Sequence, residues 1–208
     1  MNIVHPSFQI EDAPDYEQIL FKIERAGKTC YKTPILGNRE DAERFVKMII
    51  GKGHESVIEH ASITVRFIVD RGVSHELVRH RLASFSQEST RYCNYSKERF
   101  GNDVTFVYPH WYETGDEFIR LVWHAALSNA ENYYFAMLKN GMKPEDARGV
   151  LPNALKTEIV VTANLREWRT IFKQRCADNA HPDIRLIMLG LLKEVKMIYP
   201  AFFFDIQE

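Results

Sequence analysis

The sequence contains few cysteines, and none of them stands in a paired motif. Its 208 residues include three, Cys30, Cys93 and Cys176. An odd number of cysteines without a C-x-x-C pair argues against a disulfide-stabilised framework and against a zinc site built on cysteines. We therefore expect a protein of a reducing compartment, the cytoplasm.

Targeting signals and long apolar runs are also lacking. Residues 1–16 show no basic segment followed by an apolar one, so no signal peptide is expected. No apolar run approaches the length of a membrane span, and we expect no membrane partner. The formal net charge of −1 gives no overall basic field for nucleic acid, so any site for an anion has to be built locally.

The composition is that of a folded globular protein. Hydrophobic residues make up 45% of the chain and aromatic residues 12%, enough to fill a core. The length suits one domain over residues 1–208, and no repeat or linker divides it. Helices and strands are expected in mixed order without a βαβ alternation, which predicts a single compact α+β domain with an antiparallel sheet.

Hydrophobic periodicity predicts the individual elements. Alternation of period two predicts strands over residues 3–10 (broken by Pro6), 62–69, 104–108 and 159–163. Helical spacing predicts helices over residues 16–29, 39–51, 73–81, 115–140 and 166–176, and a last helix that begins at Pro182. Ser56 and Glu59 form a capping-box pattern at the start of a further helical turn.

One stretch shows no apolar periodicity and is rich in groups that bind anions. Arg79–Tyr92 reads RHRLASFSQESTRY, with three arginines around a run of hydroxyl side chains. Guanidinium groups offer paired N–H donors to phosphate or carboxylate oxygens, and hydroxyls fill the spaces between them. The stretch therefore predicts a site for a ligand with several anionic oxygens.

Two other interpretations of this stretch stay open. It could be a solvated loop with surface ion pairs, although it contains no glycine or proline. It could also bind single-stranded RNA through its arginines, extended to Arg99, with the rings of Tyr92, Tyr95 and Phe100 between them. The near-neutral net charge and the absence of known RNA-binding motifs count against nucleic acid.

The pattern in this stretch resembles the signature of the flavin-dependent thymidylate synthases. RHR-x-x-S followed by S-x-R-Y is present as Arg79-His80-Arg81, Ser84, Ser89, Arg91 and Tyr92. The resemblance implies the reductive methylation of dUMP to dTMP, with methylenetetrahydrofolate as carbon donor and NADPH-reduced FAD as hydride source. It also implies a homotetramer with active sites shared between subunits.

The resemblance assigns contacts to FAD. No G-x-G-x-x-G motif follows a strand, so a dinucleotide requires a site other than a Rossmann fold. The positions that match FAD contacts are His54, Ser56, Arg79, His80, Arg81, Gln87, Asn164 and Arg166. Asn164 is also a good N-cap for the helix that follows it.

The resemblance also assigns contacts to dUMP. The matching positions are Glu76, Arg79, Gln87, Ser89, Arg91, Arg148 and Arg175. Arg175 is the candidate catalytic residue, because a guanidinium near the uracil would stabilise negative charge on its carbonyl or ring nitrogen. From the residues alone, Arg148 and Arg175 could equally be cations at helix ends.

The chain departs from the family pattern at several positions. Glu76 stands where a glutamine often contacts dUMP, and Ser86-Gln87 replaces a frequent Asn-Glu. Residues 179–184 and Thr170 also differ from the usual residues. Glu76 keeps open the possibility of a member that binds nucleotide without catalysis.

A metal site is not expected. His54, His60, His75 and His80 lie close in sequence, but none forms an H-x-x-x-H pair on a strong helix. The neighbouring Glu55 and Glu59 are acids of the kind found at helix starts. We expect these side chains to be surface or hydrogen-bonding groups.

Overall fold

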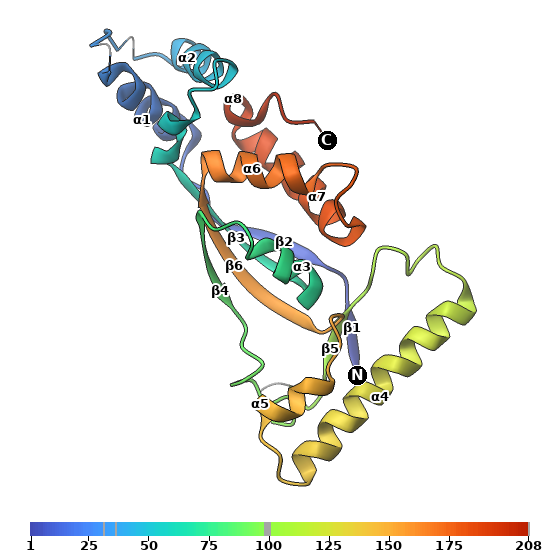
Figure 1. Cartoon of the computed structure of the whole chain (residues 1–208). Coiled ribbons are helices and arrows are strands. Elements are labelled where there is room, and N and C mark those ends of the chain that lie inside the picture. Colours follow the sequence, from blue (N-terminus) through green and yellow to red (C-terminus); the bar gives the residue numbers. More distant parts are fainter. Residues whose placement is uncertain (31, 36, 98–100, 208) are drawn as a thin grey trace. The chain divides into compact units, whose positions relative to one another are not determined.

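The computed structural model describes residues 1–30, 32–35, 37–97 and 101–207 (Figure 1). The α+β class is confirmed, because helices and strands follow one another in mixed order. The chain divides into two compact units, one of residues 1–7, 67–79 and 86–159, the other of residues 8–66, 80–85 and 160–208. A single domain over the whole chain stays a prediction.

The main sheet has four strands in the order β2 (Ser7–Asp12), β3 (Ser62–Asp70), β6 (Lys156–Asn164) and β4 (Ala83–Gln87). Along β3 and β6 every second residue is buried, as the alternation in the sequence predicts. The sheet is antiparallel. The hydroxyls of Thr64 and Thr162 lie 2.9 Å apart, and Leu165 donates its backbone N–H to Ala61.

The first unit contains a second, smaller sheet and the longest helix. Strands β1 (Asn2–Val4) and β5 (Thr105–Val107) pair in parallel, and the helices are α3 (Arg71–Leu77), α4 (Glu117–Lys139), α5 (Pro144–Ala147) and the short η3 (Arg148–Val150). Phe106, Leu127, Tyr134 and Leu155 belong to its buried core. The Asp116 carboxylate caps α4 by accepting the N–H of Phe118.

The second unit is mainly helical. It contains α1 (Tyr16–Thr29), α2 (Arg39–Gly51), η1 (Glu55–His60), α6 (Leu165–Arg175), α7 (Pro182–Ile198) and α8 (Pro200–Phe203). α1 packs closely on α2, because a Cβ atom at Gly27 would lie only 2.6 Å from Cζ of Phe45. Trp168 is buried and donates its indole N–H to the carbonyl of Ile63 at 3.0 Å.

One expectation from periodicity was wrong in detail. The helix expected over residues 73–81 runs from Arg71 to Leu77, so Arg79 and Arg81 lie beyond it. The break expected at Pro6 in the strand over residues 3–10 is confirmed, because β1 and β2 are separated by His5 and Pro6. Within Arg79–Tyr92, where no apolar periodicity was found, the structure has strand β4, whose inward-facing residues are only half-buried.

Of the helices in the described ranges, none combines the length and the apolar character needed to cross a bilayer.

Candidate functional site

Gln87, at the end of β4, is held in one orientation by buried hydroxyls of the first unit. Its side-chain nitrogen donates to Oγ of Ser74 at 2.8 Å and to Oγ1 of Thr157 at 3.1 Å. The Ser74 hydroxyl donates its own proton to the carbonyl of Arg71 at 2.9 Å, so it can only accept from Gln87. The amide nitrogen of Gln87 therefore points inward, and its carbonyl oxygen is the group left for other partners.

The negative charge of Glu88 is neutralised by a lysine of the same unit. Lys156 donates to one of its carboxylate oxygens at 2.9 Å, and the Tyr95 hydroxyl donates to the other at 3.0 Å. Burial, together with this carboxylate, raises the pKa of Tyr95 above its usual range. Because Glu88 is engaged with these two residues, it does not add free negative charge beside the arginines that follow.

Those arginines form a cationic cluster at the start of α5 and η3. Arg91 donates Nε–H to the Glu145 carboxylate at 2.9 Å, and Arg148 donates to Oγ1 of Thr90 at 2.9 Å and to the carbonyl of Glu145 at 3.0 Å. Among the described residues, no hydrogen bond or ion pair occupies the Nη groups of Arg91 or Nη2 of Arg148. Ser89 lies next to them and accepts the backbone N–H of Arg91 at 3.3 Å. We call Ser89, Thr90, Arg91, Glu145 and Arg148 the arginine cluster.

Glu145 is a member that sequence reasoning missed. Its position after Pro144 is typical of an acid that begins a helix, and nothing in its neighbourhood in the sequence links it to Arg91, 54 residues away. Glu76 and Arg79 lie in the same unit: Glu76 is half-buried in α3, and Arg79 is exposed beyond the helix. In the described ranges Arg79 makes no hydrogen bond or ion pair with protein, and the same holds for Arg81 in the second unit.

His54 and Ser56 lie on the wall of a pocket in the second unit. Its volume is about 450 Å³, within the usual size of ligand pockets. Apolar side chains of α1, α2 and η1 share the lining with two lysines: Gly27, Lys28, Cys30, Thr33, Phe45, Met48, Ile49, Lys52 and Val57 complete it. The pocket thus combines apolar surface with the cation of Lys52, because Lys28 is paired with the Glu24 carboxylate at 2.5 Å.

Asn164 and Arg166 open helix α6 in the second unit. The Asn164 side chain accepts the N–H of Glu167 at 2.8 Å, so the N-cap interpretation is confirmed. Arg166 is exposed and pairs with the Glu59 carboxylate at 2.5 Å, which raises the pKa of the guanidinium. Glu59 is therefore an ion-pair partner as well as a residue near a helix start.

Arg175 lies in the last turn of α6, as a cation at a helix end would. It also donates Nε–H to Nε2 of His80 at 3.0 Å. His80 is only 5% exposed, and its other ring nitrogen lies 3.6 Å from the Glu167 carboxylate. The resemblance gave these two residues to different ligands, whereas the structure brings them into direct contact.

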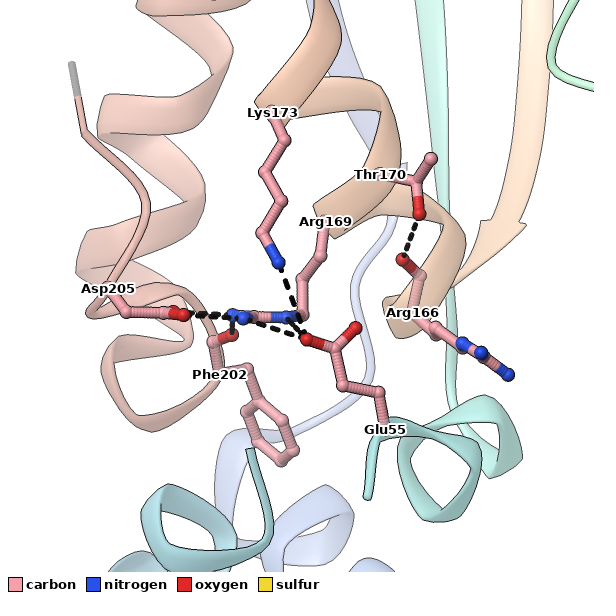
Figure 2. A network of polar contacts seen from close by, with 7 residues as sticks. All are labelled: Glu55, Arg166, Arg169, Thr170, Lys173, Phe202 and Asp205. Carbon is pink, nitrogen blue, oxygen red and sulfur yellow. Dashed lines mark hydrogen bonds and ion pairs between the residues drawn. The ribbon is translucent and has the colours of Figure 1, made fainter. Parts of the chain in front are cut away.

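A buried arginine that the sequence did not reveal connects α6 to η1 and to the C-terminal segment (Figure 2). Arg169 donates Nε–H and one Nη2 hydrogen to Glu55 at 3.2 and 3.1 Å. Its remaining donors bind the two oxygens of Asp205, both at 2.7 Å, and the carbonyl of Phe202 at 2.5 Å. All five N–H donors of the guanidinium are thus satisfied.

Glu55, which directly follows His54, is therefore more than the helix-start acid that was expected. The hydrogen bonds to Arg169 lower the pKa of Asp205, and the two carboxylates outweigh the effect of burial and raise the pKa of Arg169. No local signal marks Arg169, because an arginine on an amphipathic helix ordinarily faces solvent.

Comparison with known proteins decides the family. The family model described as "Thymidylate synthase complementing protein" matches residues 14–201. A flavin-dependent thymidylate synthase of Geobacter sulfurreducens is 34% identical over 94% of this chain and 84% of its own length. The chain belongs to the flavin-dependent thymidylate synthase family. A member from Pyrococcus abyssi is 37% identical over 76% of this chain and 64% of its own length, and one from Mycobacterium avium is 33% identical over 89% and 78%.

The resemblance drawn from the RHR stretch is therefore confirmed, and the protein is a flavin-dependent enzyme. The family residues fall into two sets. Gln87, Ser89, Arg91 and Arg148 lie in the first unit with Glu76 and Arg79, and the second unit contains His54, Ser56, His80, Arg81, Asn164, Arg166 and Arg175. The individual ligand contacts stay predictions.

Residues at two departures from the family pattern make local hydrogen bonds. Thr170 donates its hydroxyl to the carbonyl of Arg166 within α6 (Figure 2). In the segment of residues 179–184, His181 precedes the first turn of α7, and its Nδ1 accepts the N–H of Asp183 at 3.3 Å. Histidine thus takes the place of the usual capping residues at this helix start.

The described histidines belong to no metal-binding cluster. Within the ranges that the structure describes, no group of three or more His, Cys, Asp or Glu side chains is arranged to hold an ion.

Proposed function

We propose that this protein converts dUMP to dTMP by reductive methylation, with methylenetetrahydrofolate as carbon donor and NADPH as reductant. The arginine cluster is the observation that supports this most. In a chain of net charge −1, Arg91 and Arg148 each keep guanidinium N–H donors that have no partner among the described residues. A nucleotide monophosphate is a dianion that such a cluster would bind.

Each nucleotide contact has its own role in this proposal. Ser89, Arg91 and Arg148 bind the phosphate, while the inward-pointing nitrogen of Gln87 leaves its carbonyl oxygen for a donor on the nucleotide. Arg79 supplies a further cation. Glu76 offers a carboxylate, which can accept from a nucleotide hydroxyl but would repel the phosphate.

Arg175 acts on the uracil in this proposal. A guanidinium at the uracil carbonyl or ring nitrogen stabilises the negative charge that makes C5 nucleophilic toward the folate methylene. No cysteine belongs to the proposed set, so the ring is activated by charge and not by addition of a thiolate.

His54, Ser56, Arg79, Arg81, Gln87, Asn164 and Arg166 are the proposed contacts to FAD, whereas His80, which the resemblance also gave to FAD, accepts a hydrogen bond from Arg175. The pocket beside His54 and Ser56 combines apolar side chains with the cation of Lys52, which suits a flavin nucleotide. Bound reduced flavin supplies the hydride that completes the methyl group. The protein residues hold and orient it: exposed Arg79 and Arg81 are suited to the pyrophosphate.

The RNA-binding alternative is weakened by the position of one ring. Tyr95 is 7% exposed and donates its hydroxyl to Glu88, so it offers no face for stacking a base. Arg99 and Phe100 lie outside the described residues.

We further propose a homotetramer in the cytoplasm. Three free cysteines suit a reducing compartment. Phe118, Leu121 and Val122 of α4 are each more than half exposed and share one helix face, which suits burial against another copy of the chain.

The first test is the visible absorption spectrum of the purified protein before and after addition of dUMP. We expect an oxidised-flavin spectrum that shifts with dUMP, because flavin and nucleotide would then share one site. A colourless protein that takes up no added FAD would contradict the proposal.

Arg175→Ala tests the catalytic assignment. The variant should bind flavin normally and lose at least about a hundredfold in dTMP formation, in line with the loss of one charge-stabilising group. Lys173→Ala, which removes an exposed cation from the same helix, is the control and should keep its turnover. Near-normal turnover of Arg175→Ala would refute the role.

A further inference from the structure

The contact between Arg175 and His80 determines which nitrogen of the imidazole carries the proton. An arginine can only donate, so Nε2 of His80 accepts its Nε–H at 3.0 Å and carries no proton. The ring proton of the neutral imidazole is then on Nδ1. This nitrogen lies 3.6 Å from Oε1 of Glu167, so the carboxylate attracts the side of the ring that bears the proton.

These groups are enclosed by protein. His80 is 5% and Glu167 6% exposed, and burial raises the pKa of the Glu167 carboxyl. The backbone of Glu167 is fixed as well, because its N–H binds the Asn164 cap at the start of α6. Glu167 matches no ligand contact of the family, so its buried carboxyl is unexplained by the proposed function.

We infer that His80 and Glu167 are positioning residues that orient the Arg175 guanidinium for its work on the nucleotide. The inference rests on the proposed role of Arg175. An arginine side chain loses rotamer entropy when it is fixed, and an anchor at Nε fixes the plane of the guanidinium before substrate arrives. His80 in this role serves the catalytic arginine through both ring nitrogens, whereas the family resemblance gave it to FAD.

The experiment compares flavin binding with turnover in three variants of the full chain. Glu167→Leu removes the carboxylate at similar size, Glu167→Gln keeps an oxygen that faces Nδ1, and His80→Ala removes the ring. For each we measure the Kd for FAD, the KM for dUMP and kcat at saturating FAD, with thermal melting to verify folding.

We expect Glu167→Leu and His80→Ala to lower kcat by about tenfold, with the FAD Kd within about twofold of wild type. Glu167→Gln should restore most of the turnover, because it retains the acceptor and removes a buried charge. If His80 and Glu167 only stabilised the fold, their replacement would lower the melting temperature and the FAD affinity together, and would not lower kcat at an unchanged FAD Kd.

Two results would overturn the inference. One is a folded Glu167→Leu variant with normal kcat. The other is a His80→Ala variant with weak FAD binding but normal kcat once loaded, which would make His80 a flavin contact. If Glu167→Leu does not fold, the FAD Kd and kcat of His80→Ala test the inference. Failure of the proposed function is recognised separately, because Arg175→Ala would then keep its turnover.

Discussion

At the scale of residues, some side chains are oriented by a partner that can act only as a donor or only as an acceptor. The Ser74 hydroxyl is already committed to the Arg71 carbonyl, and this forces the Gln87 amide to donate inward. Arg175 forces His80 to accept in the same way. In both cases the chemistry presented to a ligand follows from donor and acceptor counts inside the protein.

Cys93 allows a test of whether a thiol takes part in the reaction. It is half-buried among the side chains around the core of the first unit, close in sequence to the arginine cluster. Because the proposed activation of uracil uses charge, Cys93→Ala should keep its turnover within about twofold of wild type. The measurement is the dTMP yield of the folded, flavin-loaded variant, and an abolished yield would show that a thiolate is required.

At the scale of elements, hydrogen bonds and ion pairs join the helices that bear the proposed flavin-binding residues to one another. Arg169 of α6 joins Glu55 of η1, so the turn that follows His54 and the helix that bears Arg166 share one buried guanidinium (Figure 2). The C-terminal segment is bound to the same group through Asp205.

Replacement of Arg169 should therefore be costly. Arg169→Met fills similar space but leaves the Glu55 and Asp205 carboxylates without their main cation, and we expect a loss of about 3 kcal/mol in the free energy of unfolding. Lys173→Met is the matched control: it removes an exposed cation that lies 3.4 Å from the same Glu55 oxygen and should cost less than about 1 kcal/mol. Denaturant unfolding of both variants measures this, and equal losses would contradict the special role of Arg169.

At the scale of the whole molecule, the apolar face of α4 bears on the proposed tetramer. Light scattering should give a mass near four times the 24.3 kDa of one chain. Leu121→Glu puts a charge on a residue that is 61% exposed and should lower this mass, because a carboxylate is costly to bury.

The control for this variant is Met197→Glu on α7, which places the same charge on an exposed apolar residue of another helix. It should leave the mass unchanged. A wild-type protein that scatters as a single chain would contradict the tetramer.

The sequence by itself determined most helices, the two long strands and the family. Helices α1, α2, α4 and α6 and strand β3 begin and end within a few residues of the expected bounds, and α7 begins at Pro182 as expected, because periodicity and capping act over short distances along the chain. The family followed from closely spaced residues in Arg79–Tyr92, and it was confirmed over residues 14–201. Strand β4 was not predicted, because its inner face presents alanine, phenylalanine and glutamine and is only half-buried.

Only the tertiary structure decided what the functional side chains contact. Arg175 and His80 are 95 residues apart in sequence, Arg169 and Glu55 are 114 apart, and Gln87 and Thr157 are 70 apart. Such pairs depend on which strands and helices pack together, and this packing cannot be predicted from a pattern of neighbouring residues. For the same reason an arginine typical of a solvent-facing helix position became a fully buried residue, since its five donors found acceptors on distant segments.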